Sequence, residues 1–314
     1  DRLFEDPPKL SAAKLSAFGS TRRPGTDASD DANLKALTAS YAPVCTIFGK
    51  TWDFHVTDAL QTALEENLDM ISDSVRFLKD AGKEVVFDAE HFFDGYYANR
   101  DYAMACLGAA VEAGADWLVL CDTNGGSLPG RISEVVEDVL LTYGTPVGIH
   151  AHNDCGLAVA NSVAAVEAGA TMVQGTVNGI GERCGNADLC SVMPILALKL
   201  GMDLGMDMGG LTDLSAGIAE VENVIRPNGL PFVGEDAFAH KGGMHVSALS
   251  KDTRTYEHID PSLVGNAQRV LMTEQGGRSN ILSLSRTLGF ELEKGDPLLD
   301  VLSAPGKAAG GYCT

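Results

Sequence analysis

The sequence has little positive charge, and this shortage narrows the kinds of partner that it can bind. Of its 314 residues, 23 are lysine or arginine and 43 are aspartate or glutamate, which gives a formal net charge of −20. A surface this acidic repels phosphate backbones and anionic lipid headgroups. We therefore expect neither a nucleic-acid partner nor a membrane partner, although one cation in a pocket can still bind a small anion.

Signals for membrane insertion and secretion are also lacking. No apolar run approaches the roughly 20 residues that span a bilayer, and the first residues, Asp1–Asp6, are too charged for a signal peptide. The seven cysteines are odd in number and form no Cys-x-x-Cys pair, which is typical of a reduced protein. The sequence thus predicts a cytoplasmic protein.

What the chain does contain is an alternation of short apolar runs with amphipathic segments. Hydrophobic residues make up 45% of it, enough for one large α/β domain and a smaller appendage. The runs are apolar on both faces, as buried parallel strands are, and follow one another at roughly the length of a βα unit. The predicted strands are Leu15–Gly19, Pro43–Gly49, Glu84–Asp88, Trp117–Asp122, Pro146–His152 and Thr171–Val177.

The segments between these strands predict helices with glycine caps. Apolar residues recur at helical spacing over Ala59–Leu78, and three helices end in a glycine at 82, 114 or 169 that a strand follows closely. These repeated junctions favour a TIM (β/α)8-type barrel, with an open doubly wound sheet as the alternative. Because only six strands can be counted, we expect the first two of the barrel to lie upstream of residue 1.

The pattern changes after about residue 200. The segment Gly201–Gly210 is rich in Met, Gly and Asp and is interpreted as a linker, followed by helices over Leu211–Asn223 and near Gln275–Leu288. The expected organisation is a catalytic barrel over residues 1–203 and a linker with a helical subdomain over 204–303. The low-complexity tail, residues 304–314, is expected to be disordered.

Polar side chains follow every predicted strand, and this is the main indication of an enzyme. In a TIM barrel the active site lies at the carboxyl ends of the strands. Polar groups gathered there are costly to bury unless they face a solvated site. The polar strand ends are Ser20–Arg23, Lys50–His55, Asp88–His91, Asp122–Asn124, His150–Asp154 and Asn178–Asn186.

The pair His150 and His152 is the strongest metal candidate among these residues. Two histidines separated by one residue on a strand project from the same face, so both can bind one ion, with amide or carboxylate oxygens completing its shell. The alternative is two hydrogen-bonded histidines that line a polar pocket.

The strand ending at Glu90 offers a second candidate. Glu90 and Asp88 share a face, and a glutamate beside a metal can act as an acid or base. The alternative is a structural ion pair with Arg22 or Arg23.

Further candidates lie in the loops. Thr123 can hydrogen-bond a substrate carboxylate, although its neighbour Asp122 can equally cap the next helix. The glycine-rich loop Asn178–Asn186 can hold a ligand or make a tight turn. The run His240–His245 and Tyr256 suggest a lid or subdomain element, with isolated surface histidines as the alternative.

Several motifs together resemble the isopropylmalate, homocitrate and citramalate synthase family, which are metal-dependent Claisen-condensing TIM barrels. The resemblance covers residues 15 to about 290, with the motifs in the family's order. The shared runs are Cys121–Gly126 (CDTNGG), Gly148–Asp154 (GIHAHND), Asn178–Asn186 (NGIGERCGN) and His240–Ala248 (HKGGMHVSA). The runs Ala17–Arg23, Thr46–Val56 and Val86–Tyr96 look most like the citramalate synthase branch.

The resemblance implies a metal site and a reaction. It makes His150, His152 and Asn186 ligands of a divalent metal (Mn²⁺, Zn²⁺, Co²⁺ or Mg²⁺) that chelates a keto acid. Glu90 matches the family's catalytic glutamate, and Thr123 matches the threonine that binds the keto-acid carboxylate. The implied reaction joins acetyl-CoA to pyruvate, with 2-oxoisovalerate as the alternative acceptor and a metal-dependent aldolase or lyase as the alternative class.

The remaining implied roles concern the edges of the site. His55 matches a pocket histidine, and Asp88 lies where pocket residues set the size of the acceptor. His245 and Tyr256 match subdomain residues that reach acetyl-CoA, often in the partner of a homodimer.

Two family segments have no counterpart in the sequence. The opening strand with its metal-binding aspartate is missing, and so is the C-terminal regulatory domain. The resemblance therefore implies a fragment that binds metal weakly and is inactive by itself.

Overall fold

The computed structural model describes residues 10–303 apart from 250, 272–277, 288 and 291, and it divides into two compact units. Unit 1 ends at Val192 and unit 2 begins at Met193. The predicted disordered tail over 304–314 lies outside the described residues. Among the described residues no helix is both long and apolar enough to cross a membrane.

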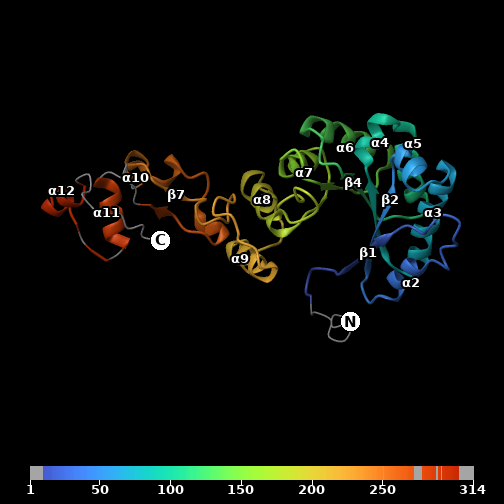
Figure 1. The fold of residues 1–314 in the computed structure, drawn as a ribbon, viewed down its shortest axis with the longest axis horizontal. Helices are drawn as coiled ribbons and strands as arrows, with labels where there is room; N and C mark the ends of the chain where they lie inside the picture. The colour runs from blue at the N-terminus through green and yellow to red at the C-terminus, as the bar shows by residue number, and fades with distance from the viewer. Residues whose placement is uncertain (1–9, 250, 272–277, 288, 291, 304–314) are drawn as a thin grey trace. The chain divides into compact units, whose positions relative to one another are not determined.

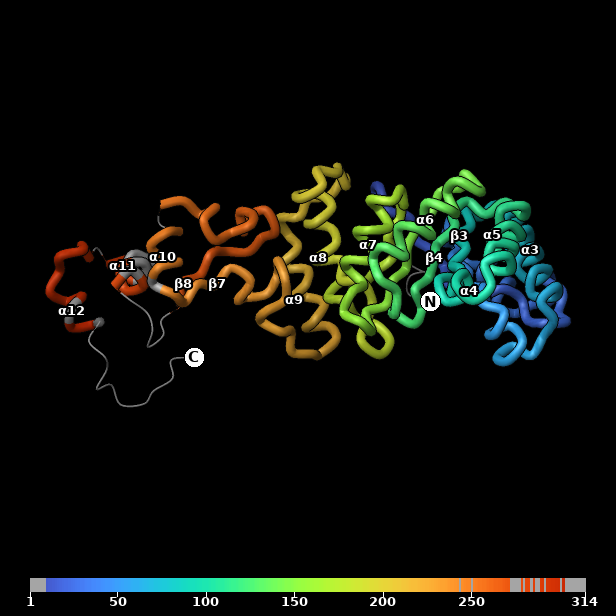
Figure 2. Tube along the Cα trace, turned by 90° about the horizontal axis from the view of Figure 1, so that it is seen from above, coloured from blue at the N-terminus to red at the C-terminus, as the bar shows by residue number. Residues whose placement is uncertain are grey.

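Unit 1 is built on one six-stranded parallel sheet with its strands in sequence order, β1 to β6. An open doubly wound sheet would reverse direction at a switch point, and this sheet does not, so the barrel-type prediction is confirmed. Helices follow the strands and lie around the outside of the curved sheet (Figure 1, Figure 2). The strands are β1 (Ser16–Ser20), β2 (Val44–Lys50), β3 (Glu84–Glu90), β4 (Trp117–Asp122), β5 (Val147–Ala151) and β6 (Met172–Gln174).

Alternating residues of each strand divide the unit into a packed outer layer and an inner face. Ile47, Phe87, Leu120 and Ile149 are fully buried on the outward side, where hydrophobic burial stabilises the helix–sheet contact. The helices of this unit are α2 (Ala32–Ala39), α3 (Leu64–Asp80), α4 (Phe92–Ala98), α5 (Arg100–Glu112), α6 (Pro129–Tyr143), α7 (Ala158–Glu167) and α8 (Leu189–Pro194), the last of which crosses the division between the units.

Two predicted elements differ from the structure. The helix expected over Ala59–Leu78 is preceded by a π-helical turn, η1 (His55–Ala59), and α3 itself begins only at Leu64. The sixth strand ends at Gln174, because Val177 already belongs to a 3₁₀ turn, η2 (Val177–Gly179).

Unit 2 is mainly helical. The predicted linker over residues 201–210 carries no helix or strand, and the predicted helices correspond to α9 (Leu211–Glu222) and α11 (Arg278–Thr287). The other elements are η3 (Ile195–Lys199), β7 (Ala239–His240), α10 (Gly243–Leu249), η4 (Thr253–Thr255), η5 (Pro261–Val264), β8 (Arg269–Val270) and α12 (Pro297–Ser303), with β7 and β8 paired in parallel.

Arg22 connects the end of β1 to α3. Its side chain is buried and reaches Glu66 Oε1 at 2.7 Å and Asp73 Oδ2 at 2.9 Å, while its backbone N–H donates to Ser74 Oγ. Burial lowers the pKa of Arg22, but the two carboxylates outweigh this and the net shift is upward. The alternative ion pair of Glu90 with Arg22 or Arg23 is wrong, because Glu90 pairs with Lys50 and Arg22 pairs with Glu66 and Asp73.

Replacing Arg22 with methionine should destabilise unit 1 by about 2 kcal/mol, because two charged hydrogen bonds are lost. Chemical denaturation followed by circular dichroism measures the change. The control is Arg76→Met, which removes a more exposed arginine 3.9 Å from the same Asp73 and should change stability little. Equal losses of stability in the two variants would show that the burial of Arg22 does not contribute to the free energy of unfolding.

Candidate functional site

Polar side chains from neighbouring strands meet in register on the inner face of the sheet. Lys50 pairs with Glu90, Cys121 pairs with His150, and His150 pairs with Gln174. Strand order thus places residues far apart in the sequence in one layer near the carboxyl ends of the strands. They border a cavity of about 200 Å³, which is lined by Phe18, Phe48, Asp88, Glu90, Cys121, Thr123, His150 and His152.

His150 is held on both sides by side-chain amides. Its Nδ1 lies 2.8 Å from Gln174 Oε1, and its Nε2 lies 3.1 Å from Asn186 Oδ1. Asp88 Oδ2 is 3.8 Å from Nδ1. Burial lowers the pKa of His150, but Asp88, Asn186 and Gln174 outweigh it, so the net shift is upward.

His152 lies directly beyond β5 and stacks on His150, with ring centroids 5.1 Å apart and planes inclined by 13°. Its Nδ1 is buried and has no hydrogen-bond partner among the described residues. Burial lowers the pKa of His152, and the neighbouring His150 and Arg183 lower it further. A buried, neutral ring nitrogen without a partner suits a metal ligand.

The loop after β6 brings Asn186 to these histidines. Asn186 forms an antiparallel bridge with His152, and its Nδ2 donates to Ile180 O at 3.0 Å. The loop is tight: a Cβ on Gly181 would lie 2.0 Å from Asn186 Nδ2, and Gly185 has a φ of +96°. Here the glycines serve a close approach of backbone to side chain.

The residues present fit a divalent metal. His150 Nε2 and Asn186 Oδ1 lie 3.1 Å apart, and the His152 ring stacks on His150, so imidazole nitrogens and an amide oxygen are available to a divalent metal such as Mn²⁺, Zn²⁺, Co²⁺ or Mg²⁺. The orphaned Nδ1 of His152 is the observation that supports this fit.

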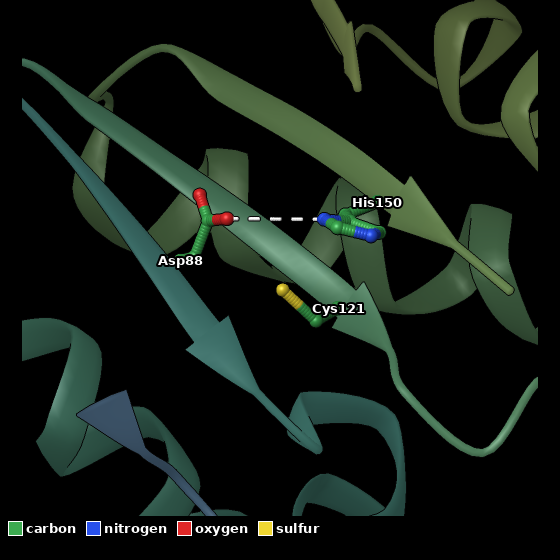
Figure 3. Close-up of side chains that lie close together, drawn as sticks. All are labelled: Asp88, Cys121 and His150. Atoms are coloured by element: carbon green, nitrogen blue, oxygen red, sulfur yellow. Dashed lines mark ion pairs between the residues drawn. The ribbon is translucent and has the colours of Figure 1, made fainter. Parts of the chain in front are cut away.

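A second set of ligand-type atoms overlaps this one. One ligand atom each from Asp88, Cys121 and His150 lies within 4.8 Å of the others, and the three side chains point toward a common space (Figure 3). Burial raises the pKa of the Cys121 thiol well above its ordinary value, and Asp88 and Glu90 raise it further. The thiol is therefore a poor ligand unless the ion itself removes its proton.

Glu90 contacts Lys50, whose Nζ lies 2.5 Å from Glu90 Oε2. Both side chains are half-buried, and Glu90 borders the cavity. The sequence prediction placed Glu90 at this site but missed Lys50 as its partner.

Thr123 borders the cavity and is fixed from both sides. Its Oγ1 accepts a hydrogen bond from the His91 backbone N–H at 2.8 Å, which leaves the hydroxyl proton free to donate to a ligand. Arg183 donates to Thr123 O and forms a two-pronged ion pair with Asp154. Arg183 thus ties the loop after β6 to the ends of β4 and β5, a role that the sequence prediction missed.

Asp122 does not cap the following helix. It is buried and accepts from the Ser127 hydroxyl at 2.9 Å and from the Ser127 backbone N–H at 3.2 Å. Helix α6 instead begins after Leu128, which makes no side-chain cap. The Asp122 carboxylate thus stabilises the turn that contains Thr123.

His55 lies beside this region rather than along the cavity wall. Its ring centroid is 4.0 Å from that of His91 and 5.2 Å from that of Trp52. Burial lowers the pKa of His55, and His91 and Lys50 lower it further. The residues that line the cavity do not include it.

His245 and Tyr256 come together within unit 2. Their rings stack with centroids 3.9 Å apart, and both side chains are exposed. Next to them His240 Nε2 lies 3.3 Å from the buried Glu257. His245 and Tyr256 are therefore one exposed group, not two isolated surface residues.

Gln174 is the functional residue that the sequence prediction missed most clearly. It ends the sixth strand and contacts both His150 and Asp88. Alternation along that strand, which places every second residue on the inner face, is the signal that could have found it.

Comparison with known proteins identifies the family of the chain. The HMGL-like family model matches residues 26–218, and the model for a homocitrate synthase post-HMGL domain matches residues 232–298. An (R)-citramalate synthase of Aquifex aeolicus is 53% identical over 92% of this chain and 56% of its own length. One from Synechocystis sp. is 52% identical over 94% of this chain, again 56% of its own length.

More distant relatives share the fold and part of the sequence. A homocitrate synthase of Methanopyrus kandleri is 36% identical over 90% of this chain and 68% of its own length. The HMG-CoA lyase structure of Bacillus subtilis superposes with a TM-score of 0.60 at 18% identity, covering 70% of this chain and 74% of that one, which shows the fold alone. The chain spans about half the length of the citramalate synthases that it matches.

Proposed function

Because the chain belongs to the HMGL-like family, we propose that it forms the catalytic part of a citramalate synthase. The reaction condenses acetyl-CoA with pyruvate and water to give (R)-citramalate and CoA, a step of isoleucine biosynthesis. The observation that carries the proposal is that His150 and His152 border one cavity together with Glu90 and Thr123, and that Asn186 contacts His150 beside it. The relatives that are about half identical to the chain and carry this name support the same activity.

The keto acid is held between the histidines and Thr123. A divalent cation bound by His150, His152 and Asn186 would supply Lewis-acid polarisation of the keto carbonyl. Thr123 donates its hydroxyl proton to the carboxylate of the keto acid, since its oxygen is already engaged by His91 N–H. These contacts orient the carbonyl carbon toward the open part of the cavity.

Proton transfer is assigned to Glu90 and to the group in unit 2. The reaction requires that a methyl proton leave acetyl-CoA, that the resulting enolate attack the keto carbon, and that the new alkoxide be protonated. Water then cleaves the thioester, which releases citramalate and CoA. Glu90 borders the cavity and acts as an acid or base on the keto-acid side. His245 and Tyr256, exposed and stacked, match family residues that reach acetyl-CoA and are proposed to act on it from the partner of a homodimer.

Pyruvate is proposed as the acceptor rather than 2-oxoisovalerate, because the relatives that are about half identical to the chain are (R)-citramalate synthases. Phe18 and Phe48 border the cavity of about 200 Å³ and stack with ring centroids 5.8 Å apart, so one side of the acceptor would face an apolar wall.

The test measures release of free CoA by the complete gene product with each keto acid. We expect release with pyruvate and little with 2-oxoisovalerate. The opposite preference would indicate a 2-isopropylmalate synthase. Absence of release together with cleavage of a hydroxyacyl-CoA would indicate a lyase instead.

Replacing Thr123 with valine should lower kcat/KM for pyruvate roughly 10- to 100-fold, because a hydrogen bond to a charged group is lost. Steady-state kinetics measures the change, and metal affinity should stay the same. The matched control is Thr123→Ser, which keeps the hydroxyl and should retain most of the activity. A serine variant as slow as the valine variant would contradict the role of the hydroxyl.

A further inference from the structure

Asp88 fixes the orientation of the Gln174 amide. The Asp88 side chain is only 1% exposed, and its Oδ1 lies 2.8 Å from Gln174 Nε2. A carboxylate can only accept, so the amide must turn its NH₂ group toward Asp88. Its oxygen then faces His150 Nδ1, at 2.8 Å.

This orientation determines which ring nitrogen of His150 carries hydrogen. Gln174 Oε1 can only accept, so His150 Nδ1 must donate to it. On the other side, Asn186 gives its NH₂ group to Ile180 O and presents its oxygen to His150 Nε2 at 3.1 Å. When the ring is neutral, with its hydrogen on Nδ1, the Nε2 lone pair and the Asn186 oxygen are both available to one cation.

We propose that Asp88 and Gln174 are positioning residues: Asp88 orients Gln174, and Gln174 holds His150 with Nδ1–H toward itself and Nε2 toward the ion. This rests on the proposed function, because the ion belongs to that reaction. Partners that hold the second nitrogen of a metal-binding histidine fix its orientation and raise its affinity for the metal. Burial of an unpaired carboxylate would be costly, and the bond to Gln174 offsets that cost.

The competing interpretation makes Asp88 a direct ligand together with Cys121 and His150. Those three side chains are close enough to hold an ion. However, the His150 nitrogen that faces Asp88 is Nδ1, 3.8 Å from Asp88 Oδ2, and this nitrogen is already engaged by Gln174. Asp88 also lies two residues before Glu90 on β3. Its side chain therefore stands further from the carboxyl ends of the strands than those of Glu90 and His150.

Metal affinity separates the two interpretations. Titration calorimetry of the chain with Mn²⁺ and with Zn²⁺ should show affinity about 10- to 100-fold weaker in Asp88→Ala and in Gln174→Ala. Asp88→Asn keeps an oxygen that can accept from Gln174 and should stay within a few-fold of the parent. The double variant Asp88→Ala, Gln174→Ala should be no weaker than Gln174→Ala, because the two residues act in series.

Cys121→Ser is the matched control and should bind almost as well as the parent. The proposal is overturned if Asp88→Asn is as damaging as Asp88→Ala while Gln174→Ala is harmless, since Asp88 would then be a ligand. Circular dichroism of each variant confirms that the fold is retained.

A second readout needs no metal. In ¹⁵N NMR spectra of the metal-free chain at alkaline pH, the His150 ring, assigned with His150→Gln, should carry its hydrogen on Nδ1. Asp88→Ala and Gln174→Ala should lose this form. The proposal is contradicted if the parent His150 ring carries its hydrogen on Nε2. It is also contradicted if both variants keep the hydrogen on Nδ1. Failure of the pyruvate assay would instead refute the proposed function and leave these spectra unaffected.

Discussion

Replacing His150 with alanine is expected to lower turnover of pyruvate by about 1,000-fold or more, because polarisation of the keto carbonyl by a metal is worth several kcal/mol. The substitution removes one metal ligand directly. It also leaves Gln174 Oε1 and Asn186 Oδ1 without the ring nitrogens that they now contact. Steady-state release of CoA by the complete gene product, with titration of the metal in parallel, measures both effects.

The matched control is His258→Gln, which changes a histidine of unit 2 that packs against Phe232 and Phe238. Its metal affinity and turnover should equal those of the parent. If His150→Ala still binds the metal with the parent affinity, the assignment of His150 as a ligand is wrong.

Replacing Glu90 with glutamine is expected to lower kcat roughly 100- to 10,000-fold, the range associated with loss of a general acid or base. Glutamine keeps the shape of the side chain but cannot carry the proton, so KM for pyruvate and metal affinity should change little. The ion pair with Lys50 is lost as well. A modest loss of stability is therefore expected, which thermal denaturation measures separately.

Glu84→Gln provides the comparison from the same strand. Glu84 begins β3 and pairs with the exposed Lys14, so it has a similar charged contact at the opposite end of the strand. This variant should keep full kcat. A variant at Glu90 that loses metal affinity rather than kcat would show that Glu90 supports the metal site and does not transfer protons.

The two substitutions also test different parts of the proposed reaction. His150→Ala should affect metal binding and turnover together, whereas Glu90→Gln should separate them. Parallel loss in both variants would place Glu90 among the groups that hold the ion. The sequence did not predict the ion pair between Lys50 and Glu90. Because this ion pair also fixes the Glu90 side chain, the two roles of Glu90 have to be separated by measurement.

Much of the fold could be predicted from the sequence, because local patterns carry the relevant physics. Strands apolar on both faces and helices that end in glycine indicate parallel βα units. The errors occurred where tertiary contacts override local preference. Examples are the π-helical turn at His55–Ala59 and the early end of β6 at Gln174.

Part of the candidate site could likewise be predicted from the sequence, and part could not. By itself the sequence determined that His150 and His152 end a strand on one face, and that polar residues cluster at the strand ends. Only the tertiary structure decided that Lys50 faces Glu90 and that Gln174 stands between Asp88 and His150. The physical reason is that these partners depend on strand order, register and the curvature of the sheet, which bring together residues up to 86 positions apart and leave no trace in any local spacing.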